Sequence, residues 1–167
     1  WSVDGVRSLQ AKIDRLRVPR VGPYRVVCLY GRDAMACAIA SNNLPAIRAL
    51  LKSGREVEGK IFELDERSAY PYWICYTPLV FATYFGHLGA VRVLIEAGAD
   101  INKANNDDAT ALIAASGQGH AAIVEILLQA GADVDKAMND GDTALMLAIG
   151  AEHNAVVKVL KKAGAKS

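Results

Sequence analysis

Apolar residues along this chain follow the spacing of short amphipathic helices, and turn-forming residues interrupt them at regular intervals. After the Gly86-His87 dipeptide, for example, Val91, Leu94 and Ile95 recur at helical spacing and predict one face of a helix. The run before this dipeptide predicts another helix, in which small alanines allow close packing. The connectors "INKANNDD" and "VDKAMNDGD" are rich in turn residues. The pattern therefore predicts pairs of short helices separated by polar loops.

The same pattern occurs three times at a fixed offset of 33 residues. The copies are "YTPLVFATYFGHLGAVRVLIEAGADIN" from Tyr76, "ATALIAASGQGHAAIVEILLQAGADVD" from Ala109 and "DTALMLAIGAEHNAVVKVLKKAGAK" from Asp142. Three residue types align in all of them: Thr77, Thr110 and Thr143; His87, His120 and His153; Gly98, Gly131 and Gly164. The threonines suit helix N-caps, and the glycines suit left-handed C-caps.

A degenerate fourth copy lies upstream, in "DAMACAIASNNLPAIRALLKSG" from Asp33 to Gly54. Met35 stands in the place of Leu79, and Asn43 stands in the place of His87. The distance to the next copy is 44 residues rather than 33, so the connector carries eleven extra residues. The sequence therefore predicts four helix pairs with an insertion after the first.

The period of 33 residues, "TPL" at Thr77, the "GH" dipeptides and the "GAD" tripeptides together resemble the ankyrin repeat family. The resemblance implies an all-α solenoid of stacked helix pairs with short β-hairpin fingers at right angles to the helices. Because one unit cannot bury its own apolar face, neighbouring units must stack. We expect a basic N-terminal capping segment at 1–32, repeats at about 33–54, 72–104, 105–137 and 138–167, and the insertion within 55–71.

The copies depart from the family pattern at two places. Family members usually carry His after "TPL", whereas this chain has Val80, Ile113 and Met146, so the Thr–His hydrogen bond of typical repeats is expected to be absent. In the last copy Glu152 replaces the glycine of the "GH" turn. Four lysines of this copy fit a solvated C-terminal cap: Lys158, Lys161, Lys162 and Lys166.

Seven of the eleven aromatic residues lie in the stretch "YPYWICYTPLVFATYF", from Tyr70 to Phe85. The resemblance assigns Phe81 to the core. It implies that five other side chains line an exposed, concave binding surface: Trp73, Ile74 and Tyr76 in the finger before the second repeat, and Tyr84 and Phe85 at the end of its first helix. Large exposed aromatic side chains anchor interfaces, because they bury much area with few torsions to freeze. As an alternative, Ile61, Phe62 and Leu64 of the insertion fold back over these aromatics as a lid.

The corresponding positions in the later repeats are small or acidic, and they include Asn106, Asp107, Gln118, Asn139, Asp140 and Asp142. We expect these six residues to complete the partner-binding surface. Aromatic faces beside Asp107 or Asp108 would also suit a cationic side chain, including a methylated lysine.

Charge divides the chain into two parts. Residues 1–32 carry seven Lys/Arg against two Asp/Glu, although the whole chain has a net charge of only +1. The segment from Ser2 to Arg20 has an apolar stripe and predicts an amphipathic helix that caps the stack or meets an anionic partner. The chain begins with Trp1 rather than Met, and we expect it to be a piece of a longer protein.

Candidate chemistry is sparse. Histidines one solenoid step apart cannot converge on one zinc ion, so we expect His87, His120 and His153 to be turn residues. No phosphate-binding glycine motif occurs, and the spacing of the aspartates does not match a calcium-binding loop. Cys28, Cys37 and Cys75 have no motif spacing and indicate reduced thiols. We therefore expect no catalytic residue, metal or cofactor.

The sequence thus predicts a non-catalytic module that binds another protein or peptide inside the cell, in the cytoplasm or nucleus. It predicts no small-molecule substrate. One alternative is a regulatory segment of a larger enzyme, channel or ligase adaptor. Another is binding of nucleic acid or an anionic membrane through the basic first thirty residues, which would be strongly salt-dependent.

Overall fold

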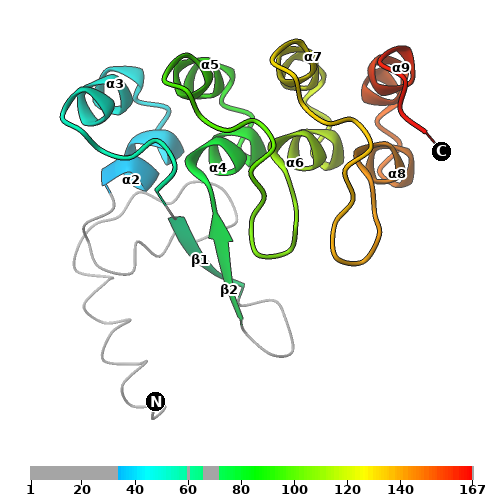
Figure 1. The fold of residues 1–167 in the computed structure, drawn as a ribbon, viewed down its shortest axis with the longest axis horizontal. Helices are drawn as coiled ribbons and strands as arrows, with labels where there is room; N and C mark the ends of the chain where they lie inside the picture. Colours follow the sequence, from blue (N-terminus) through cyan, green and yellow to red (C-terminus); the bar gives the residue numbers. More distant parts are fainter. Residues whose placement is uncertain (1–33, 60, 66–71, 167) are drawn as a thin grey trace.

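The computed structural model describes residues 34–59, 61–65 and 72–166, and for 61–65 and 72–75 it describes the backbone only. Within these ranges the chain forms four consecutive helix pairs (Figure 1). The pairs are α2 (Ala34–Ala40) with α3 (Leu44–Lys52), α4 (Pro78–Tyr84) with α5 (Leu88–Glu96), α6 (Ala111–Gly117) with α7 (Ala121–Gln129), and α8 (Ala144–Gly150) with α9 (Asn154–Lys162). The expected N-terminal segment at 1–32 lies outside the described residues.

The helices form two layers. Helices α2, α4, α6 and α8 pack side by side in one row, and α3, α5, α7 and α9 form the second row above them (Figure 1). Each helix also contacts its own partner in the other row. The predicted all-α solenoid of stacked helix pairs is therefore confirmed.

A threonine caps the N-terminus of the first helix in each of the last three pairs. The hydroxyl oxygens of Thr77, Thr110 and Thr143 accept hydrogen bonds from the backbone N–H three residues ahead, at 3.2–3.3 Å. Each bond satisfies a backbone donor that has no partner within the helix. The second helix of every pair is followed by a glycine with positive φ, as predicted: Gly54, Gly98, Gly131 and Gly164.

The core runs along the whole stack between the two layers. Large side chains with almost no exposed surface alternate with alanines, and they include Ile39, Phe81, Leu94, Leu112, Leu127 and Leu160. The small residues let neighbouring helices approach, and the large ones fill the space between the layers. Phe81 is fully buried, as the sequence predicted.

The insertion lengthens the first finger. Strand β1 (Ile61–Asp65) pairs antiparallel with β2 (Tyr72–Tyr76), and Ile61 lies opposite Tyr76 in the register. The two strands project from the stack as one hairpin (Figure 1). The later fingers are shorter loops: one contains a single bridge between Ala137 and Thr143, and the other is closed by a backbone bond from Asn105 to Ala109.

A ladder of hydrogen bonds connects equivalent positions of successive repeats. In each hydrogen bond of this ladder, a side-chain oxygen of one repeat accepts from a backbone N–H of the next. The three rungs are Glu58 Oε1 to Asp100 N at 2.7 Å, Asn102 Oδ1 to Asp133 N at 2.8 Å, and Asp135 Oδ1 to Lys166 N at 2.9 Å. Glu58, Asn102 and Asp135 occupy the same position of three successive repeats. The first repeat therefore still follows the common pattern at Glu58, and the eleven inserted residues lie in the finger after it.

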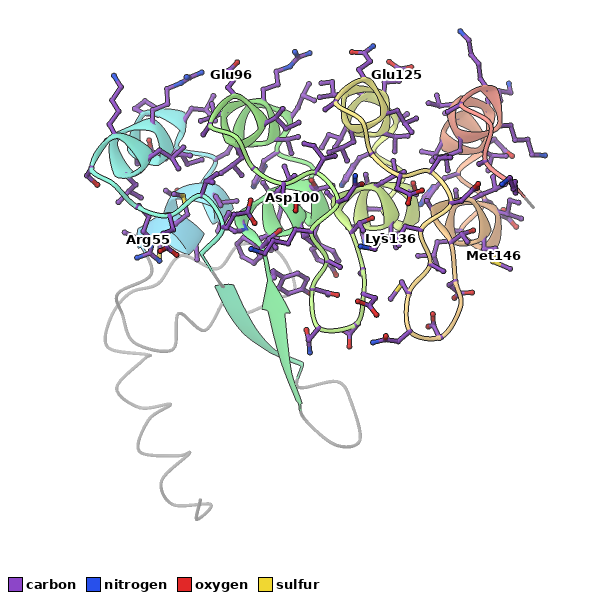
Figure 2. The ribbon with its side chains drawn as sticks, viewed as in Figure 1. Arg55, Glu96, Asp100, Glu125, Lys136 and Met146 are labelled. Atoms are coloured by element: carbon purple, nitrogen blue, oxygen red, sulfur yellow. The ribbon has the colours of Figure 1, made fainter. Side chains whose placement is uncertain are left out.

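Lysines reinforce this ladder. Lys103 Nζ lies 3.1 Å from the second carboxylate oxygen of Glu58, and Lys136 Nζ donates to the carbonyl of Asn102 at 2.9 Å. Asp100 and Lys136 both lie where the helical stack meets the loops (Figure 2). These contacts hold the base of each finger to its neighbour and so fix the direction in which the fingers project.

Candidate functional site

Five rings cluster where the first finger meets α4. Tyr76 lies 5.9 Å from Phe81 and 6.2 Å from Tyr84 between ring centroids. Phe85 packs edge-on against Phe81 at 4.9 Å and stacks on His87 at 6.0 Å. These five rings are packed on one another, and the five by themselves leave no open box of the kind that holds a methylated lysine.

The burial of this cluster corrects the expected exposure of two residues. The side chain of Tyr76 is only 8% exposed and belongs to the core. Phe85 is half-buried and packs against the core. The expectation that Tyr76 is an exposed anchor is wrong, because the rings of Phe81 and Tyr84 pack against it. Phe85 is less exposed than expected, since its ring packs against Phe81 and His87. Tyr84 is also half-buried, but it lies outside the set of residues packed on the core.

Trp73 and Ile74 lie on strand β2, in the finger, as expected. Their side chains lie outside the described residues. The backbone register puts Leu64 opposite Trp73 and Glu63 opposite Ile74. The inserted strand thus runs alongside β2 as its hairpin partner. Whether Ile61, Phe62 and Leu64 also cover the aromatic side chains lies outside what the structure describes.

The structure brings together two of the predicted acidic loops. Asn139 of the later finger donates from its backbone N–H to the carbonyl of Asp107 at 3.2 Å, and from its side chain to the carbonyl of Asn106 at 3.3 Å. Asn105 folds the earlier loop by accepting from the N–H groups of Asp107 and Ala109 at 2.9 and 2.8 Å. The two loops are therefore neighbours held by direct bonds.

The edge formed by these loops is acidic. Asp108 and Asp140 are exposed, and Asp107 and Asp142 are half-exposed. Residues 104–109 and 137–143 contain no Lys or Arg to neutralise them. The nearby lysines, Lys103 and Lys136, bind the ladder instead. The tips of the two fingers thus present clustered carboxylates to solvent, which favours a cationic partner.

Gln118 is exposed immediately after α6. It occupies the position that Phe85 occupies one repeat earlier, and the preceding residue, Gly117, corresponds to Tyr84. Large side chains in one repeat are therefore followed by small or polar ones in the next. The surface beside the fingers changes along the stack from aromatic at α4 to open and polar at α6.

The three histidines occupy the turns between paired helices, as predicted. His153 Nε2 donates to the carbonyl of Gly117 at 3.1 Å, so this ring bonds backbone one repeat away. No group of three or more His, Cys, Asp or Glu side chains in the described part of the chain is arranged to hold a metal ion. Among the described helices, none combines the length and apolar character that crossing a membrane requires.

Comparison of the repeats reveals surface features that single motifs missed. The bonds from Asn139 to the preceding finger have no motif of their own. The alignment did contain a signal, because Asn106 and Asn139 fall one period apart. The lysines assigned to the C-terminal cap are exposed, whereas α8 exposes two large apolar side chains, Met146 and Ile149.

Comparison with known proteins gives one family. The profile described as "Ankyrin repeats (3 copies)" matches residues 14–105 and, in a second overlapping match, residues 79–167. The two matches together cover most of the chain. A search of curated proteins found no significant match.

Proposed function

The chain belongs to the ankyrin repeat family, whose members generally bind other proteins, and we propose that it binds a basic segment of a partner protein along its fingers. The observation that carries the proposal is the pair of bonds from Asn139 to the backbone of Asp107 and Asn106. These bonds join two acidic finger tips into one preorganised edge. Preorganisation favours binding, because less conformational freedom is lost when the partner docks.

The proposed surface has two parts. The acidic edge, formed by Asn106, Asp107, Asn139, Asp140 and Asp142, attracts cationic residues and accelerates association. Beside it, Tyr84 and Gln118 contact the partner at the ends of α4 and α6. Trp73 and Ile74 extend this surface along the first finger. Tyr76 and Phe85 support it from beneath, since they pack against Phe81 and His87.

No catalytic step is part of this proposal. The three cysteines support a reducing, intracellular compartment as part of the same proposal.

The test is affinity capture from cell extract, followed by kinetic measurement on the partner that is identified. We expect the double variant Asp107→Asn/Asp140→Asn to bind that partner with an association rate constant about tenfold lower at low salt. Tyr84→Ala should mainly accelerate dissociation.

The matched control removes two carboxylates from the other side of the molecule. Glu96 and Glu125 are exposed on α5 and α7, away from the fingers (Figure 2). Glu96→Gln/Glu125→Gln changes the net charge by the same amount. Equal loss of binding in both double variants would contradict the proposal, because it would indicate a general charge effect rather than a site at the finger tips.

A further inference from the structure

The C-terminal end of the stack exposes an apolar face on α8. Met146 and Ile149 are each 51% exposed, and they are the two exposed large apolar side chains among the residues that the structure describes. They lie three residues apart, so they share one face of the helix. Figure 2 shows Met146 on α8, at the end of the stack.

This face corresponds to the surface through which earlier repeats stack. Val80 and Ile113 occupy the position of Met146 and are 1% and 2% exposed. Thr83 and Ser116 occupy the position of Ile149 and are fully buried. Helix α4 packs on α6, and α6 packs on α8. Because these positions are buried where another repeat follows and exposed in the last one, we assign them to the side that packs on the next helix. The exposed face of α8 is therefore continuous with an established helix–helix interface.

The α9 half of the same end is polar. In the first repeat, Leu44 packs toward the next repeat: a Cβ at Gly89 would lie 2.9 Å from its Cδ1 atom. The equivalent residue of the last repeat is Asn154, which is exposed. Lys161, also exposed, replaces the half-buried Ile95 and Leu128 of earlier repeats. The apolar part of the end face thus lies mainly on α8, with the partly exposed Val157 as the contribution of α9.

The turn after α8 also differs from the turns that accept another repeat. A Cβ at Gly86 or Gly119 would lie 2.7 or 2.8 Å from the histidine ring of the following repeat. The equivalent residue in the last repeat is Glu152, with φ of 58° and a real Cβ. The last turn therefore lacks the open space that the glycines at 86 and 119 provide for a histidine ring.

We propose that the α8 face binds a single amphipathic helix of another protein, with acidic residues beside its apolar stripe. One helix against Met146 and Ile149 reproduces the packing of α8 on α6 without needing an apolar α9 or a glycine at 152. The acidic residues would meet Lys161, which occupies a stacking position of earlier repeats, is exposed and has no ion-pair partner within the described part of the chain.

Lys161 also disfavours a second copy of this chain as the occupant. If two such end faces met, the lysine-bearing α9 helices of both copies would lie at one interface. The turn between α8 and α9 supplies a single carboxylate, that of Glu152. An acidic helix instead gives charge complementarity along with apolar burial. This face lies on different residues from the acidic edge proposed above.

The test is selection of helical peptides from a displayed library of 16-residue sequences against the full chain. We expect the selected peptides to carry apolar residues at i, i+3 and i+4 and a majority of Asp and Glu among the charged positions. Their affinity should fall at least about tenfold for Met146→Gln/Ile149→Ser, because apolar anchors dominate such interfaces. It should fall more modestly for Lys161→Gln.

Two controls make the outcome decisive. Tyr84→Ala, on the surface beside the fingers, should leave the affinity of these peptides unchanged. Both Met146 and Ile149 are exposed, so their double variant should unfold at the same urea concentration as the parent. If the double variant is destabilised, peptide affinity is measured on Ile149→Ser alone. The proposal is overturned if no selected peptide depends on residues 146 and 149, if basic peptides are preferred, or if sedimentation shows that the face joins two copies.

Discussion

His153 donates from Nε2 to the carbonyl of Gly117, and the same ring lies against Gly119, where an added Cβ would come within 2.8 Å. The histidine of one repeat thus occupies the space that the glycine of the preceding turn leaves open. His120 has the same relationship with Gly86. The "GH" dipeptide is therefore a contact between successive repeats, in which each glycine accommodates the histidine of the repeat that follows.

This contact predicts that replacing a glycine that lies against a histidine ring destabilises the fold more than replacing a glycine with open space beside it. Gly119→Ala must adopt positive φ and also displace the ring of His153, so we expect a loss of about 3 kcal/mol or more in the free energy of unfolding. Gly131→Ala has a similar φ of 91° but no atom within 4 Å of the added Cβ. Its expected loss is about 1 kcal/mol. Urea unfolding followed by circular dichroism measures both, and equal losses would mean that the ring moves away freely.

The aromatic cluster predicts that neighbouring residues have separate roles. Phe85→Ala removes a ring that packs between Phe81 and His87, and it should lower the free energy of unfolding by about 2–3 kcal/mol. Tyr84→Ala should cost less, about 1–2 kcal/mol, because its ring meets Tyr76 and Phe85, whereas Phe85 packs directly on the fully buried Phe81. Thermal and urea unfolding of the two variants decide the matter. If Tyr84→Ala lowered the free energy of unfolding more than Phe85→Ala, Tyr84 would be the packing residue and Phe85 the better candidate for partner contact.

The ladder predicts a cost at Asn102. Its side chain accepts from Asp133 N at 2.8 Å and donates to the carbonyl of Gly131 at 3.2 Å. Asn102→Ala removes both bonds and should lower the free energy of unfolding by about 1–2 kcal/mol. Asn154→Ala is the matched control, since no side-chain bond of Asn154 lies within the described residues. Hydrogen exchange at the Asp133 amide should accelerate in the first variant and remain unchanged in the second.

Repetition made the helix pairs and their boundaries predictable. Thr77, Thr110 and Thr143 cap their helices as expected, because capping depends on a bond to a residue only three positions away. The C-terminal glycines were predictable for the same reason. Local rules of this kind require no knowledge of the neighbouring repeat.

The burial of Tyr76 could not be predicted in this way. Its position just before Thr77 indicates only that it lies at the base of a finger. Whether its side chain points to solvent depends on Phe81 and Tyr84 of α4, whose rings pack against it. The bond between Asn139 and Asp107 likewise depends on how closely adjacent fingers approach. The first contact depends on how the finger folds onto α4 and the second on how repeats stack, and the alignment of repeats gives the positions of these residues but not the distances between them.

The ladder from Glu58 through Asn102 and Asp135 also has a mechanical consequence. Its rungs of 2.7–2.9 Å connect neighbouring repeats at the junction between helices and fingers. Short hydrogen bonds resist stretching far more strongly than apolar contacts resist sliding. When the stack flexes, we expect the row of hydrogen-bonded finger bases to keep its length while the spacing of the outer helices changes. The stack should therefore bend about this row.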